Sequence, residues 1–185
     1  MGPALSPSTT LRAGSAEGLS APEAASQGGE TLKADQFFDH WNTVHRDLLR
    51  GVAMLKDEHL GFRPAPSYSR SVGGILRHIV NLQDGWIQYV IRRDLPAWPE
   101  EGDPNGPSVA ALRGELERAH KATVAYLATL PVDDFNRIVQ VPGDGTPKLG
   151  WILWHVFEQV IHHRGELFLC LSLLGLQRPK IDRPG

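Results

Sequence analysis

The sequence predicts an all-α fold, a four-helix bundle, and three observations support this prediction. Apolar residues recur at steps of three and four along four long segments, the spacing that gives a helix one apolar face. Prolines, glycines and capping residues separate these segments. No convincing run of alternating apolar and polar residues is present that would build a sheet. Four helices with one apolar face each can bury those faces only against one another.

From Thr31 onward the apolar residues follow the helical period, and a first helix of about 23 residues that ends before Gly61 is expected. Its apolar face consists of Phe37, Trp41, Val44, Leu48, Val52 and Leu55. The prolines at 64 and 66 then interrupt the helical pattern, because proline lacks an N–H donor and restricts the residue before it.

Ser71 is expected to be the N-cap of the second helix, which runs to about Arg93. The apolar face of this helix consists of Val72, Ile75, Leu76, Ile79, Leu82, Trp86 and Val90. The following segment, 94–107, holds four prolines and two glycines and forms a long crossover. The second helix is about 33 Å long. The extended connection reaches about 46 Å, which is long enough to run back along the whole helix. The second and third helices could therefore be parallel, which gives an up-down-down-up bundle.

Ser108 is expected to cap the third helix, which ends at Pro131 and has an inner face of Leu112, Leu116, Ala119, Thr123 and Leu127. A short β-like piece, 138–141, and a turn at 142–145 precede the fourth helix. Thr146 is expected to cap that helix, with Pro147 at its first position. The helix is expected to stop at Gly175, a natural C′ glycine.

The composition divides the chain into a bundle and two tails. Residues 1–32 are expected to be a disordered tail because they hold few large apolar side chains. The bundle is expected over 33–178, followed by a C-terminal tail over 179–185. Deleting residues 1–30 is therefore not expected to remove packing from the bundle.

Composition also excludes several classes of function. A net charge of −2 and a pI near 6.4 argue against nucleic-acid binding, which needs clustered excess Lys and Arg. No apolar run approaches the roughly 20 residues that span a membrane. A single cysteine excludes a disulfide framework and a thiolate zinc site within one chain. Because the first residues do not resemble a secretory signal, a cytoplasmic location is expected.

The fourth helix carries polar residues along an otherwise apolar sequence. His155, Gln159, His162 and Glu166 fall within roughly 60° of one another around the helix axis, and His163 lies about 40° beyond Gln159. A buried polar stripe is costly unless each group finds a partner. His78 lies on the inward side of the second helix. An inward histidine and a pair spaced i, i+4 on a neighbouring helix is the geometry of a facial metal site. Histidines hydrogen-bonded inside a bundle would show the same pattern.

Two segments resemble the DinB/YfiT-like superfamily. The segment from Phe62 to His78 is similar to the entry into that family's second helix. The segment from Ile152 to Glu166 is similar to the signature of its final helix. The resemblance covers about residues 33–178. It implies an up-down-down-up four-helix bundle that is often a homodimer.

The resemblance also implies a cofactor and a kind of ligand. Many family members bind nickel, zinc or another divalent ion through three histidines. Characterised relatives include transferases and isomerases that use a small thiol, namely mycothiol, bacillithiol or glutathione. A divalent metal ion, nickel or zinc, and a thiol or other small molecule are therefore the implied partners. The family's DNA-damage name implies no contact with DNA.

Carried over residue by residue, His78 matches the first metal ligand and His163 the third. The second ligand position falls on Gln159, where the family has histidine. A Gln side chain offers only a neutral amide oxygen, which is a weaker ligand for nickel or zinc than imidazole. Three possibilities follow: Gln159 binds through its oxygen, His155 or His162 substitutes for it, or the site is vestigial.

The other notable residues have structural interpretations. Arg164 is expected to pair with a carboxylate or helix carbonyls, and Glu166 could orient His162 or His163. Cys170, among leucines, is expected to be an inert core thiol. Surface positions are expected for His40, His45, His59 and His120, and positions in the core or a dimer interface for Trp86, Trp151 and Trp154.

Two functions of different class follow. The first is a metal-dependent enzyme of the thiol-transferase type, which the retained His78 and His163 favour. The second is a metal-poor bundle that binds a small molecule or assembles with a partner without catalysis, which Gln159 favours.

Overall fold

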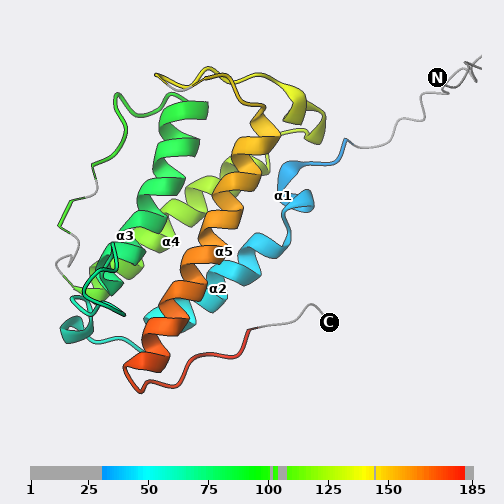
Figure 1. Cartoon of the computed structure of the whole chain (residues 1–185). Coiled ribbons are helices and arrows are strands. Elements are labelled where there is room, and N and C mark those ends of the chain that lie inside the picture. Colours follow the sequence, from blue (N-terminus) through cyan, green and yellow to red (C-terminus); the bar gives the residue numbers. More distant parts are fainter. Residues whose placement is uncertain (1–30, 101, 104–107, 144, 182–185) are drawn as a thin grey trace, which may run out of the picture. The chain divides into compact units, whose positions relative to one another are not determined.

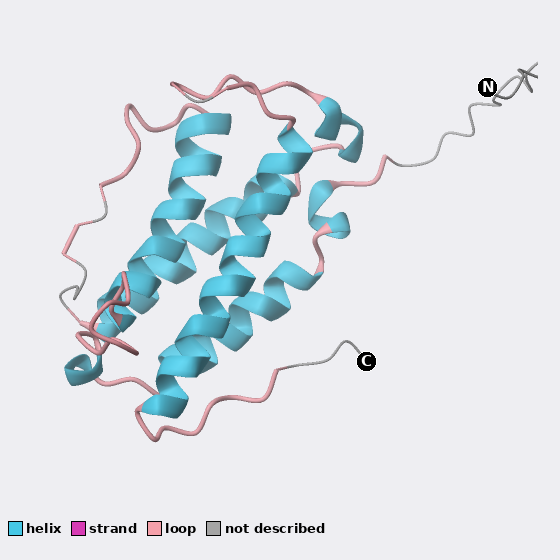
Figure 2. Cartoon of the chain, in the orientation of Figure 1, coloured by secondary structure: helices cyan, strands magenta, loops and turns pink. Residues whose placement is uncertain are grey.

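The computed structural model describes residues 31–100, 102–103, 108–143 and 145–181. Most of the predicted N-terminal tail and residues 182–185 of the predicted C-terminal tail lie outside this range. The all-α class is confirmed: over the described ranges the chain forms five α-helices, three short segments of 3-10 or π-helix and no strand (Figure 2).

Four long helical segments build the bundle, namely α2 (His40–Val52), α3 (Val72–Gln83), α4 (Val109–Leu127) and α5 (Leu149–Leu173). A short helix, α1 (Ala34–Phe37), precedes them (Figure 1). Helix α2 packs on α4 and α5, and α3 packs on the same two helices. Helices α2 and α3 therefore lie diagonally opposite each other although they are consecutive in the chain. Among the described residues no helix is long and apolar enough to cross a membrane.

The prediction of one continuous first helix is wrong. The helix breaks at Phe38 and Asp39, and its second part ends at Val52. The break buries Phe38, which is 4% exposed, and leaves Phe37 51% exposed, the reverse of the predicted apolar face. The Phe38 ring packs against Trp41 and Phe157. Burial of this ring outweighs the regular helical spacing on which the prediction was based.

The second helix begins as predicted. The hydroxyl oxygen of Ser71 accepts a hydrogen bond from the backbone N–H of Gly74 at 3.2 Å, which confirms the N-cap. The helical path continues to Ile91, but its last eight residues, η2 (Asp84–Ile91), are π-helical. The predicted apolar face is buried except for the half-buried Trp86.

The crossover after η2 is held along α3. Trp98 packs against Trp86, with ring centroids 5.6 Å apart. Farther along, Asn81 donates to the carbonyl of Glu100 at 3.0 Å, and Arg77 donates to the carbonyl of Asp103 at 3.1 Å. Later residues of the connection thus meet earlier residues of α3, so the connection runs back toward the start of that helix (Figure 1). These contacts favour the up-down-down-up order, which stays a prediction for the bundle as a whole.

The third helix is capped by Ser108, whose hydroxyl accepts from the N–H of Ala111 at 3.1 Å. Its predicted inner face is fully buried. The predicted start of the fourth helix is wrong, because α5 begins at Leu149 with Lys148 as its N-cap. Lys148 is extended and forms an isolated antiparallel bridge with Ile138, which delays the helix. Residues 138–141 form no strand beyond this bridge. At the other end of α5, Gly175 has a φ of 73°, the left-handed conformation expected of a glycine just after a helix.

The tryptophans of α5 lie at the surface of the described chain. Trp151 and Trp154 are 55% and 54% exposed, so they do not belong to the core. They lie on the exposed side of α5 with Ile161, Leu169 and Leu173, interspersed with the exposed polar residues Glu158 and His162. Exposed large apolar side chains bordered by polar residues are typical of interaction surfaces. The homodimer stays a prediction, and this surface of α5 is a candidate for its interface.

Two histidines occupy the contact between α2 and α4. His45 is only 6% exposed, so its predicted surface position is wrong. Its ring stacks on that of His120, with centroids 3.8 Å apart and planes 5° from parallel. The Nε2–H of His120 donates to the side-chain oxygen of Asn42 at 2.9 Å. Burial lowers the pKa of His45 to about 4 and that of His120 to about 3.

Stability is therefore expected to fall on acidification below about pH 6.5, the unfolded pKa of histidine. Because the folded pKa values are depressed, the unfolded chain takes up protons first, and stability is lost progressively as the pH falls toward 4. Between pH 7 and pH 5 the loss is at most about 2 kcal/mol per histidine. Urea unfolding at several pH values measures it. His45→Phe, which keeps a ring but cannot titrate, should flatten the profile; an unchanged profile would contradict this account.

Candidate metal centre

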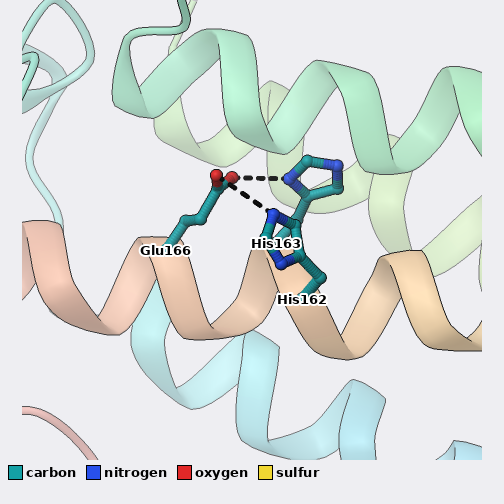
Figure 3. A group of neighbouring side chains, drawn as sticks. All are labelled: His162, His163 and Glu166. Atoms are coloured by element: carbon teal, nitrogen blue, oxygen red, sulfur yellow. Dashed lines mark hydrogen bonds and ion pairs between the residues drawn. The ribbon is translucent and has the colours of Figure 1, made fainter. Parts of the chain in front are cut away.

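The polar stripe of α5 converges on the carboxylate of Glu166. The Nδ1 atom of His163 lies 2.6 Å from one oxygen of this carboxylate, and Nε2 of His162 lies 3.3 Å from the other (Figure 3). The hydroxyl of Tyr68, from the loop before α3, donates to the same carboxylate. His163 is 3% exposed, whereas the side chain of His162 is 59% exposed. Glu166 thus holds the buried histidine in place, as the sequence predicts.

This contact fixes the state of the His163 ring. A carboxylate only accepts hydrogen bonds, so Nδ1 of His163 carries the proton and Nε2 has a free lone pair. That Nε2 atom is buried and has no hydrogen-bond partner among the described residues. Leaving a buried acceptor unpaired costs about 1–3 kcal/mol. A histidine whose other nitrogen donates to a carboxylate is the usual arrangement of a metal ligand.

His78 faces His163 from α3, as the sequence predicts. The centroids of the two rings are 4.7 Å apart, and the rings meet edge to face at 86°. The guanidinium of Arg70 lies 3.2 Å from Nδ1 of His78. Since a guanidinium can only donate, this Nδ1 atom accepts. The lone pair of Nδ1 is therefore shared with a cation in this arrangement.

Two sets of donors meet at His163. His162, His163 and Glu166 could hold a metal ion, because one donor atom from each lies within 4.8 Å of the others. Since Glu166 lies beside Nδ1 of His163, an ion bound by these two residues through Nδ1 would displace the Nδ1 proton. The sequence-derived set of His78, Gln159 and His163 would instead use the unpaired Nε2 atom. Gln159 is half-buried, one turn before His163 on α5.

The substitutes proposed for Gln159 differ in position. His162 lies beside Glu166, close to the candidate centre. His155 stacks on Trp151, with centroids 5.1 Å apart and planes 5° from parallel, two turns before His163. His155 therefore belongs to the aromatic cluster around Trp86, which is 5.8 Å from it between ring centroids.

Comparisons with known proteins agree with this description. The family model of the DinB superfamily matches residues 40–167, more than two thirds of the chain. The chain belongs to the DinB superfamily. Its fold is similar to the crystal structure of a DinB-like protein from Bacillus cereus ATCC 10987, with a TM-score of 0.63 and 19% identity, over 83% of this chain and 100% of that one. At this identity the likeness concerns the fold alone. A comparison with curated proteins found no match.

In this DinB superfamily member the protonation states suit a metal ligand. Burial lowers the pKa of His163, so its imidazole is neutral at pH 7, the form that ligates. Burial alone would raise the pKa of Glu166, but hydrogen bonds from Tyr68 and His163 hold it below its usual value. The hydrogen bond to Glu166 raises the pKa of Tyr68 to about 12, so Tyr68 remains a donor.

Sequence reasoning missed Tyr68 and Arg70. Both lie in the loop 62–70, of which only the prolines at 64 and 66 have a role in the sequence-based prediction, as the end of the first helical pattern. The loop is part of the segment that resembles the family's second-helix entry, and this resemblance was the available signal. Because a loop has no periodicity, the sequence could not show which of its side chains point toward α5.

The neighbours of the candidate centre on α5 are structural. The guanidinium of Arg164, 8% exposed, pairs with the fully buried carboxylate of Asp47 on α2 at 3.1 Å, which confirms the predicted carboxylate partner. Cys170 is fully buried, and burial raises the pKa of its thiol to about 11. It is therefore an inert core thiol, as predicted.

Proposed function

We propose that this DinB superfamily protein binds a divalent metal ion, nickel or zinc, through His78, Gln159 and His163. The observation that supports this most directly is the buried Nε2 atom of His163, which has a free lone pair and no hydrogen-bond partner among the described residues. His78 supplies a second imidazole from the facing helix. An amide oxygen and two neutral imidazoles are acceptable ligands for both ions.

We further propose that the protein, with its metal bound, would promote attack of a small thiol on an electrophilic carbon of a substrate: the S–H proton passes to solvent, a C–S bond forms, and the group displaced from that carbon leaves with its bonding electron pair. The bound ion would supply the positive charge that keeps the thiol deprotonated. The thiol must come from a small molecule, because the protein's own Cys170 is buried and its pKa is raised to about 11. Mycothiol, bacillithiol and glutathione are the candidates that the family resemblance implies.

The chain's own residues orient the site. Glu166 accepts the Nδ1 proton of His163 and so keeps the opposite nitrogen available. Tyr68 holds Glu166 from the other side and ties the loop before α3 to α5. The orientation of the His163 ring is therefore fixed by Glu166 on α5 and, through Glu166, by Tyr68 in the loop before α3.

Metal content decides the first part of the proposal. Protein purified without a histidine tag is expected to contain nickel or zinc, or to bind one equivalent after chelation and dialysis, measured by elemental analysis and calorimetric titration. His59→Gln, which changes a histidine on η1 (Asp57–His59) that contacts Lys56 and Glu58, should bind as the wild type does. Failure of the wild type to bind either ion would refute the metal-site proposal.

One observation favours the second function, a metal-poor bundle that binds a small ligand. The Arg70 guanidinium donates to Nδ1 of His78, and a cation at this position opposes a second cation nearby. Gln159 is also the weakest of the three proposed ligands. A protein that binds no metal but retains a small molecule on purification would support this alternative.

A further inference from the structure

A pocket of about 200 Å³ lies beside His78, between the loop before α3 and the first turns of that helix. Its polar lining includes Arg63, Ser69, Arg70, Ser71, Arg77 and His78. Three of these residues are arginines, and none of the described residues that line the pocket carries a carboxylate. Such an excess of positive charge inside a concave surface favours an anionic ligand.

Only one of the three arginines has a carboxylate partner within the described part of the chain. Arg77 forms an ion pair with Glu115 at 3.2 Å. Arg63 donates to the backbone carbonyls of Tyr68 and Ser69 at 2.8 and 2.9 Å. Arg70 donates to the neutral ring of His78. Arg63 and Arg70 are therefore held by neutral acceptors, which fix the positions of their guanidinium groups and leave both groups without a carboxylate partner among the described residues.

The start of α3 does not itself provide the binding groups. The N–H groups of Val72 and Gly73 donate to the carbonyls of Phe62 and Leu60, both at 2.9 Å. The N–H of Gly74 donates to the Ser71 hydroxyl. With these donors occupied, an anion in the pocket would be held by arginine side chains.

We propose that this pocket binds the anionic group of the substrate, a carboxylate or a phosphate, and that Arg70 is its main ligand. The planar guanidinium matches both groups through two parallel hydrogen bonds. Arg70 is the choice because it is half-buried and its acceptor, His78, belongs to the candidate metal centre. An anion that takes up the Arg70 guanidinium would release the Nδ1 lone pair of His78, so the anionic group would lie next to the reacting centre.

That the anionic group belongs to the substrate rests on the proposed function. Anion binding itself can be measured in the absence of metal. Inorganic phosphate and succinate, in separate titrations at constant ionic strength, are added to chelator-treated wild-type protein and followed by NMR. Saturable shifts are expected at the Arg70 Nε–H and at backbone amides of residues 69–78. The anion that binds more tightly identifies the group as phosphate or carboxylate.

Three variants test the role of Arg70. Arg70→Met is expected to weaken binding at least about ten-fold, since it removes charge-assisted hydrogen bonds. Arg70→Lys keeps the charge without the planar fork, and an intermediate loss is expected. Arg113→Met is the matched control, because Arg113 pairs with Glu117 on the exposed side of α4. Folding of each variant is checked by its amide spectrum.

The two proposals can fail separately. No saturable binding of either anion to the wild type, or equal affinity in Arg70→Met, would overturn the anion site even if nickel binds. Anion binding that depends on Arg70 in a protein that binds no metal would support this site and refute the proposed function.

Discussion

Replacing Gln159 with histidine is expected to tighten nickel or zinc binding by at least about ten-fold. The change would complete a face of three imidazoles with His78 and His163, in place of two imidazoles and an amide oxygen. Changes to groups that only orient ligands already alter metal affinity by about 10–100-fold, so a change of ligand should do at least as much. The side chains are similar in size, and the packing cost should stay below about 1.5 kcal/mol. Calorimetric titration at fixed pH measures the change, since protons compete with the ion.

His163→Ala provides the control for this experiment, because His163 is the one residue common to both donor sets. It should abolish binding in the wild-type and Gln159→His backgrounds alike. Equal affinity of wild type and Gln159→His would mean that another residue already fills the position. His162 is the candidate in that case, since it lies 3.3 Å from Glu166. Absence of binding in both proteins would leave the small-molecule-binding bundle as the better account.

Replacing Asp47 with alanine is expected to cost about 3–5 kcal/mol of unfolding free energy. Asp47 is fully buried on α2 and contacts Arg164 at 3.1 Å and Arg50 at 2.6 Å. Removing the carboxylate would leave the Arg164 guanidinium, itself 8% exposed, as a buried charge without this partner. Urea unfolding monitored by circular dichroism measures the loss.

An exposed ion pair of the same chain is the comparison. Glu117 pairs with Arg113 at 3.0 Å on the surface of α4, where both side chains are nearly half exposed. Glu117→Ala should cost less than about 0.5 kcal/mol. A cost for Asp47→Ala as small as this would show that Arg164 finds other compensation in the mutant.

The sequence alone predicted what depends on local patterns. The caps at Ser71 and Ser108 are examples, because a serine before an apolar helical stripe satisfies a backbone N–H three residues later. The approach of His78 to His163 was predicted because both lie on inward faces of helices that the fold brings together. Their role as ligands, with Gln159, stays a prediction.

Features that depend on tertiary contacts could not be predicted. Phe37 fits the helical spacing, yet Phe38 is buried because the chain turns between α1 and α2. His45 directly follows Val44 of the predicted apolar face, but only the packing of α2 on α4 reveals its stack on His120. Tyr68 and Arg70 reach the candidate centre through the path of a loop, which no periodicity records.

The packing of α2 on α5 has a consequence for how the chain folds. These are the first and last long helices, and Gly51 of α2 lies so close to Phe168 of α5 that an added Cβ would be 2.8 Å from the ring. Contacts this distant in sequence require closure of most of the chain, so they form more slowly than contacts between successive helices. During synthesis, the part of the α2 apolar face that packs on α5 therefore stays exposed to solvent until α5 has emerged from the ribosome.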